Sequence, residues 1–179
     1  LDRMKGMIFT ELFELIEEKF GFELLDDVIM ESKLENDGTY AATGNYQFSE
    51  LLKVVVSLSN KSGVSIPDLL EVFGEHLFSK LVKSFPHLVE KQSLLHFIPE
   101  VENYIHVEVK KLYPDVELPK FEIVKNEEKT VQFYYISSKK LHHLAKGLLQ
   151  GAATYFNENA DITMDASDDT RVLFTIKIA

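Results

Sequence analysis

The histidines are the side chains of this sequence that say most about which metals or cofactors it could bind. The chain has six histidines and no cysteine, which excludes disulfides, thiolate nucleophiles, iron–sulfur clusters and cysteine-ligated zinc or haem. A metal or a metal-bearing cofactor must therefore take imidazole or oxygen ligands. His142 and His143 are adjacent, so on a helix they point about 100° apart and cannot chelate one ion together. His76, His87 and His96 do not have the spacing of a metal-binding pair on one helix.

His106 has the setting that best suits a metal ligand. We expect it on a helix that Pro99 opens and that ends at Tyr113, before Pro114. The apolar stripe of this helix runs through Ile98, Val101, Ile105, Val109 and Leu112. His106 lies at the border of that stripe, where one ring nitrogen can face inward to a metal while the other meets a carbonyl or water. The same position suits a half-exposed structural histidine, so the spacing alone leaves both interpretations open.

Two hydroxyl groups and a cation follow one another between residues 135 and 139. Tyr135, Ser137 and Lys139 alternate where a strand passes into a helix, so they can project to one side of the extended chain. Beside the unpaired N–H groups of a helix start they would form a site for a carboxylate or a phosphate. In the alternative interpretation, Ser137 or Ser138 caps the helix, Tyr135 belongs to the core, and Lys139 and Lys140 are solvated.

The elements that position these residues are helical first and mixed later. The patterns predict helices over residues 7–20, 24–30, 48 to about 61, 66–84 and 99–113, with Ser65 as a helix cap. After Pro119 they predict strands at 121–124 and 130–135, a helix over 141–156, and strands at 162–164 and 172–178. Two hairpins around one helix favour an antiparallel sheet covered on one face. We therefore predict an α+β fold, in which a helical N-terminal part packs on a mixed C-terminal part.

Composition excludes several classes of function. The chain has 179 residues and a formal net charge of −10, which disfavours nucleic-acid binding because phosphate neutralisation needs a basic surface. No segment reaches the roughly 18 apolar residues of a membrane span. The start, Leu1 to Gly6, has no apolar block followed by a small-residue cleavage site, so we expect no signal peptide, no membrane association and a cytoplasmic location. The sequence lacks HExxH, GxSxG and a glycine-rich phosphate loop, so we do not expect an enzyme.

Several short motifs occur in an order and at spacings that point to one family. They are Met4-Lys5-Gly6 before an apolar helix, Phe73-Gly74-Glu75, Phe85-Pro86, the surroundings of His106 from Ile105 to Tyr113, Leu118-Pro119, and Tyr135-x-Ser137-x-Lys139. From Met4 onward the sequence resembles the haem–nitric oxide/oxygen binding (H-NOX) domain, the sensor module of bacterial signalling proteins and of soluble guanylate cyclases. One departure is clear: Lys139 stands where the family motif has arginine.

The resemblance implies a haem site and assigns its residues. Residues 4–179 would form a single haem-binding domain after three leading residues, with haem b (iron protoporphyrin IX) buried between parts at about 4–65 and 66–179. His106 would be the proximal iron ligand, and Pro119 would press on the haem and distort it. The haem propionates would be bound by Tyr135, Ser137 and Lys139. The distal pocket would be lined by Ile8, Leu12, Leu77, Phe78, Leu81, Leu144 and Leu148.

The resemblance also implies which gas is sensed and how. Family members that hold O2 stably have a tyrosine where this chain has Leu144, so the chain should bind NO and CO but not hold O2 stably. Binding of NO would weaken the iron–His106 bond and pass a signal to a separate sensor histidine kinase or cyclic-di-GMP enzyme. The competing hypothesis is a non-haem, acidic, helical interaction or adaptor domain in which His106 is structural.

Overall fold

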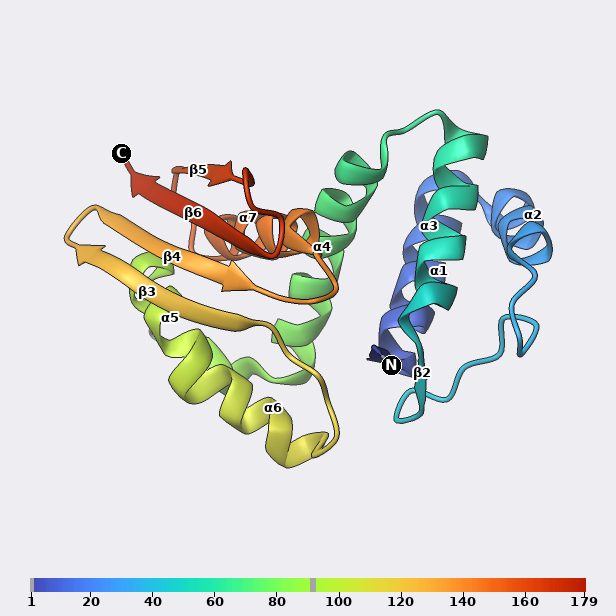
Figure 1. The fold of residues 1–179 in the computed structure, drawn as a ribbon, viewed down its shortest axis with the longest axis horizontal. Coiled ribbons are helices and arrows are strands. Elements are labelled where there is room, and N and C mark those ends of the chain that lie inside the picture. Colours follow the sequence, from blue (N-terminus) through green and yellow to red (C-terminus); the bar gives the residue numbers. More distant parts are fainter. Residues whose placement is uncertain (1, 91–92) are drawn as a thin grey trace.

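The computed structural model describes residues 2–90 and 93–179 of the chain. Up to residue 84 the chain contains β1 (Arg3–Lys5), α1 (Gly6–Phe20), α2 (Phe22–Ser32), β2 (Asn45–Gln47), α3 (Phe48–Ser62) and α4 (Ile66–Ser84). The remainder contains η1 (Pro86–Leu88), α5 (Leu94–Glu100), η2 (Val101–Ile105), α6 (His106–Leu112), β3 (Lys120–Glu127), β4 (Thr130–Ile136), α7 (His142–Tyr155), β5 (Ala160–Asp165) and β6 (Arg171–Ile178). Figure 1 shows α1, α2 and α3 on one side, the large sheet on the other, and α4 between them. The prediction of an α+β fold is confirmed.

The first three helices form one apolar core with the start of α4. On α1, Phe9, Leu12 and Ile16 are buried at helical spacing, and the ring of Phe9 stacks on Tyr40 with 4.1 Å between centroids. Strand β1 pairs with β2 in antiparallel register, Met4 opposite Tyr46. This small sheet ties the beginning of the chain to the segment before α3.

Helix α4 connects the two cores of the molecule. It starts as the sequence predicts, because the Ser65 hydroxyl accepts a hydrogen bond from the Asp68 backbone N–H at 3.2 Å. Its residues Phe73 and Leu77 belong to the core of the first helices, whereas Phe78 belongs to the core beneath the large sheet. Neither α4 nor any other helix of the described residues has the length and apolar character needed to cross a bilayer.

The large sheet is antiparallel and has the strand order β3-β4-β6-β5. Along its two central strands, buried side chains alternate with more exposed ones, so one face of the sheet is buried. The buried residues are Val131, Phe133 and Tyr135 on β4 and Val172, Phe174 and Ile176 on β6. They share one core with apolar residues of α5 and α7, and Figure 1 shows both helices on the same side of the sheet. The predicted one-sided cover is therefore present.

The segment that carries His106 differs from the prediction. Pro99 does not open a helix: α5 starts at Leu94, after Ser93, and Pro99 lies inside it. A proline has no N–H to bond the preceding turn, and the chain soon widens into a π-type turn, η2, before α6 begins at His106. The predicted apolar stripe holds for Ile98 and Val101, which are buried, and fails at its end, where Leu112 is 52% exposed. A π-type turn uses an extra residue per hydrogen-bonded ring, so a stripe drawn at α-helical spacing drifts after it.

Helices α4 and α7 approach each other so closely that their crossing requires glycine. A methyl group added to Gly147 would lie 2.0 Å from the Glu71 carbonyl oxygen, and one added to Gly74 would lie 2.4 Å from the Leu144 carbonyl oxygen. No real Cβ atom occupies such positions, so the two backbones are in direct contact here. This crossing presses the first half of α7, including Leu144, against α4.

Candidate functional site

A cavity of about 850 Å³ lies where α1, α4, α6 and α7 meet the ends of β3 and β4. This volume is in the range of cofactor and ligand pockets. Its wall on α4 and α7 is apolar and consists of Leu77, Phe78, Leu81, Val82, Leu144, Ala145, Leu148 and Leu149. Its polar residues come from the chain start and β2, from α6 and the segment after it to the start of β3, and from the end of β4 and the segment that follows. The cavity thus has an apolar interior and a charged rim.

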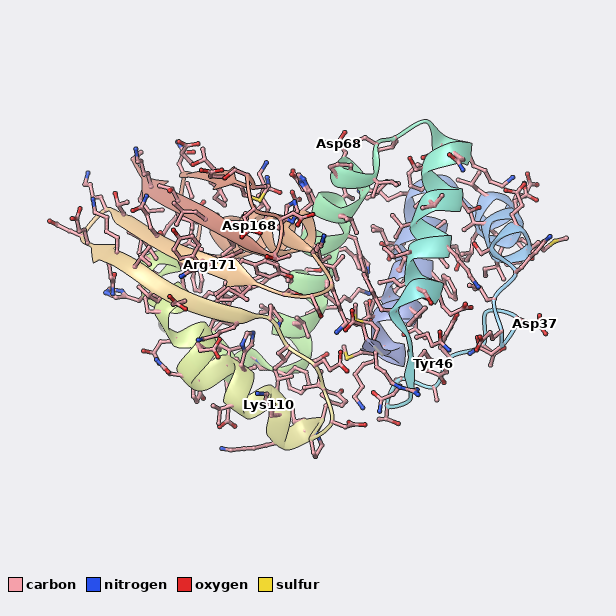
Figure 2. All side chains as sticks on the ribbon, viewed as in Figure 1. Asp37, Tyr46, Asp68, Lys110, Asp168 and Arg171 are labelled. Carbon is pink, nitrogen blue, oxygen red and sulfur yellow. The ribbon has the colours of Figure 1, made fainter. Side chains whose placement is uncertain are left out.

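His106 lines this cavity from the first position of α6. Its side chain is 12% exposed, and Nδ1 lies 3.4 Å from the Glu102 Oε2 atom. Burial lowers the pKa of His106 below its usual range, while the Glu102 carboxylate opposes the shift and Lys110 adds to it. Lys110 lies farther along α6 (Figure 2). The lowered pKa favours the neutral imidazole, which is the form that can donate a lone pair to a metal.

The structure brings Tyr135, Ser137 and Lys139 together in the wall of the same cavity. Burial raises the pKa of Tyr135 to about 12, against the opposing effect of Ser137 and the Leu141 backbone, so its hydroxyl stays a donor. The Lys139 side chain is only 8% exposed, and its Nζ lies 2.6 Å from the Glu117 Oε2 atom. The alternative interpretation of this segment is correct in part and wrong in two respects. Tyr135 is 4% exposed and belongs to the core beneath the sheet. No side chain caps α7, whose N-cap residue is Leu141, and the Lys139 side chain is buried, not solvated.

Most of the predicted distal residues line the cavity, and one does not. Ile8, Leu77, Phe78, Leu81, Leu144 and Leu148 line it, and so does Pro119. Within the described residues, Leu12 is not part of the wall: it is 2% exposed in the core of the first helices. The reason is that the cavity reaches only the first turn of α1, at Met7 and Ile8. Leu12 lies one turn farther along the helix.

The remaining histidines make contacts outside the cavity. His76 Nε2 lies 3.2 Å from Glu11 Oε2, and with Glu14 these residues form a group of possible metal ligands. Lys80 already pairs with Glu14 there, so the cluster is an ion-pair network between α1 and α4. His143 Nδ1 lies 3.0 Å from Glu71 Oε1 and joins α7 to α4. Neither histidine lines the cavity described above.

Two acidic residues that contact residues of the cavity wall were not predicted as part of the site. Glu102 precedes His106 by four residues, a spacing that places two side chains on one face of a helix. The contact between Glu102 and His106 could therefore have been predicted from the sequence. Glu117 lines the rim and pairs with Lys139. It lies outside the helices and strands, and no sequence periodicity connects it to a residue 22 positions away.

Comparison with known proteins identifies the family. The family model described as "Haem-NO-binding" matches residues 5–164 of this sequence. The chain belongs to the Haem-NO-binding family. The predictions of the family and of haem as its cofactor are confirmed, and membership supports a haem-based gas sensor. No match was found among curated proteins.

Solved H-NOX structures share the whole fold. The ferrous, unliganded H-NOX protein from K. algicida is 40% identical, with a TM-score of 0.93 over 98% of this chain and 97% of that one. The Shewanella woodyi H-NOX, solved in its Fe(II)CO state with IWP-051 bound, is 38% identical, with a TM-score of 0.85 over 98% and 95%. The S. oneidensis H-NOX in its Fe(II)NO state is 26% identical, with a TM-score of 0.90 over 98% and 99%.

The cavity of this Haem-NO-binding chain fits a haem by its chemistry. An imidazole stands on one wall, leucine side chains form the apolar wall, and Tyr135, Ser137 and Lys139 provide donors and a cation for two carboxylates. His106 is the imidazole in this wall. The residues that would hold the cofactor are therefore those that the cavity already brings together.

Proposed function

We propose that this domain senses NO and CO, does not hold O2 stably, and signals through weakening of the bond between the haem iron and His106. The observation that carries the proposal is that His106 and a continuous apolar wall share one cavity. The bound haem would supply the iron to which a diatomic gas binds, and His106 would hold that iron. In this proposal the chain acts as a sensor domain and not as a catalyst.

The apolar wall explains the proposed choice of gas. The residues of α4 and α7 in the cavity wall, among them Leu77, Leu144 and Leu148, have hydrocarbon side chains and offer no hydrogen-bond donor. Donors in a haem pocket decide whether O2 is retained. NO and CO need little such help, so this wall favours them over O2.

The packing of α6 explains how a change at His106 could become a signal. No residue of α6 is fully buried, although His106 at its start is only 12% exposed, so few packing contacts beyond those of His106 hold the helix where it lies. A weakly packed element is the kind that moves at small cost in free energy. We propose that the iron–His106 bond holds α6 in place, that Pro119 presses on the haem, and that loss of the bond releases the helix. The receiver of the signal would be a sensor histidine kinase or a cyclic-di-GMP enzyme.

The decisive experiment tests His106 as the ligand. The purified protein, reconstituted with haem, should show an intense Soret band that is lost in His106→Gly and restored by added imidazole. His96→Gly is the matched control, because His96 is exposed on α5 and lies outside the cavity. A Soret band that persists unchanged in His106→Gly would contradict the assignment. Failure of the unaltered protein to bind haem would favour a non-haem interaction domain.

A second measurement tests the choice of gas. The ferrous, reconstituted protein should change its absorbance spectrum with NO and with CO, whereas air should give no lasting O2 complex. A stable O2 spectrum in air would contradict the proposal while leaving haem binding intact.

A further inference from the structure

One carboxylate oxygen makes two contacts beside His106. Glu102 Oε2 accepts a hydrogen bond from the Phe121 backbone N–H at 2.9 Å, and the same atom lies 3.4 Å from His106 Nδ1. Glu102 lies in the π-type turn η2, directly before α6, whereas Phe121 lies in β3. The glutamate therefore connects the helix of His106 to the edge of the large sheet.

The sheet holds this arrangement through stacked aromatic rings. The ring of Phe121 meets the His106 ring edge-on, with centroids 5.6 Å apart. Phe121 stacks on Phe133 at 4.5 Å, and Phe133 stacks on Phe174 at 5.1 Å. Phe133 and Phe174 are completely buried, so the position of Phe121, and with it the N–H that binds Glu102, is set by the rigid interior of the sheet.

We propose that Glu102 is a positioning residue that fixes the tautomer and the basicity of His106, and so sets the strength of the iron–histidine bond. The inference rests on the proposed function, in which His106 is the iron ligand. An ionised carboxylate can only accept hydrogen bonds, so the proton of the neutral ring lies on Nδ1 and the lone pair on Nε2. A carboxylate partner of this kind orients a metal-bound imidazole and raises its basicity.

Three variants separate the parts of this role. Glu102→Gln keeps the size of the side chain and an oxygen for the Phe121 N–H, but it removes the negative charge. Glu102→Ala removes both the charge and the contact. Glu108→Ala is the matched control, because Glu108 lies in the first turn of α6 and pairs with Lys111, away from the His106 ring.

The first readout needs no haem. Nitrogen-15 NMR of the haem-free protein should show His106 with the proton on Nδ1 in the unaltered protein and in Glu108→Ala. Glu102→Ala should shift the ring toward the tautomer with the proton on Nε2, and Glu102→Gln should lie between them. An unchanged His106 tautomer in Glu102→Ala would overturn the proposal.

The second readout uses the reconstituted, ferrous protein. Resonance Raman spectroscopy should show a lower iron–histidine stretching frequency in Glu102→Ala than in the unaltered protein, with Glu102→Gln intermediate. Haem loss from Glu102→Ala should be faster by roughly 10- to 100-fold. An unchanged frequency in a folded Glu102→Ala protein that binds haem would overturn this inference alone, whereas failure of the unaltered protein to bind haem would overturn the proposed function.

Discussion

Lys139 is a buried cation that already has an anionic partner. Its Nζ contacts Glu117 Oε2 at 2.6 Å, and that carboxylate oxygen also accepts a hydrogen bond from the Arg3 backbone N–H at 3.2 Å. The contact with Lys139 holds the pKa of Glu117 below its usual range. A carboxylate entering the cavity must therefore share Lys139 with Glu117, and lysine offers only a point charge where arginine would offer a planar fork.

Replacement of Lys139 by arginine should strengthen haem retention. We expect Lys139→Arg to lose haem more slowly than the unaltered protein, and with less dependence on salt, because the guanidinium can bind Glu117 and a propionate in fixed geometry. Haem transfer to apomyoglobin at low and high salt measures both effects. Lys140→Arg is the control, since Lys140 pairs at the surface with Asp169. Equal rates for Lys139→Arg and the unaltered protein at all salt concentrations would refute this prediction.

At the scale of elements, the crossing of α4 and α7 determines the apolar wall of the cavity. Both helices contribute leucines to that wall, and Gly74 and Gly147 let their backbones touch. Beside the glycines, Glu71 of α4 binds His143 at 3.0 Å and Lys146 at 3.1 Å on α7. Close packing and ion pairing therefore act at the same crossing.

Substitution of Gly147 should separate the two helices. In Gly147→Ala the new methyl group would collide with the Glu71 carbonyl oxygen. We expect the free energy of unfolding to fall by about 1–3 kcal/mol, although alanine favours helices by roughly 1 kcal/mol over glycine. Urea denaturation measures the change. Gly151→Ala, where the nearest atom is Phe78 Cβ at 2.9 Å, should lose less stability; an equal loss in both variants would count against a specific contact at Gly147.

The Glu71 contacts should make stability depend on pH. Burial alone would raise the pKa of Glu71, but hydrogen bonds from His143 and Lys146 outweigh it and lower the pKa below the usual carboxyl value of 4.5. A lowered pKa in the folded state stabilises the protein above the usual carboxyl pKa, and this contribution is lost as pH falls through the lowered pKa. We expect Glu71→Gln to reduce the free energy of unfolding near pH 7 by about 1 kcal/mol or less.

Urea denaturation at several pH values tests this prediction. The difference between Glu71→Gln and the unaltered protein should shrink as pH falls below the usual carboxyl pKa and disappear below the lowered one. Glu75→Gln, at an exposed position of the same helix, is the matched control. A difference of the same size at all pH values would mean that the contact does not act through the charge of Glu71.

At the scale of the whole molecule, a buried lysine joins the start of the chain to the segment after α6. Lys5 is 6% exposed, and its Nζ contacts Asp115 Oδ1 at 2.6 Å and the Thr43 carbonyl oxygen at 3.2 Å. Asn45 donates a hydrogen bond to the other oxygen of Asp115. Lys5 lines the cavity, so these contacts join the chain start to the segment after α6 at the cavity rim.

Removal of Asp115 should destabilise the protein because it leaves Lys5 buried without its counter-charge. We expect Asp115→Ala to lower the free energy of unfolding by about 1–3 kcal/mol, the cost of a buried charged donor that loses its partner. Thermal and urea denaturation of the haem-free protein measure it. Asp169→Ala is the control: its partner Lys140 is 49% exposed, so its loss should be smaller than about 1 kcal/mol. Equal effects would show that the burial of Lys5 is unimportant.

The sequence by itself determined the elements and the residue types of the site. Helical and alternating patterns predicted the positions of α1, α4, α7 and the four strands, because burial of one face imposes a period on the residues that form it. The absence of cysteine excluded a thiolate ligand for any haem, and the motif around His106 indicated a histidine ligand and its position. The helical pattern predicted that Leu12 is buried, but it could not show whether Leu12 lies in the first core or in the cavity wall, because both environments are apolar.

Only the tertiary structure decided which side chains share the cavity and which partners they have. A period along one element cannot show that Glu117 meets Lys139, or that Lys5 meets Asp115, since both pairs join distant segments through irregular backbone. The π-type turn before His106 also broke the regular spacing from which its neighbours were predicted. The packing of η2 against β3 places Glu102 between His106 and Phe121. Contacts of this kind depend on how the surfaces of two elements fit together, which the order of residues within either element does not determine.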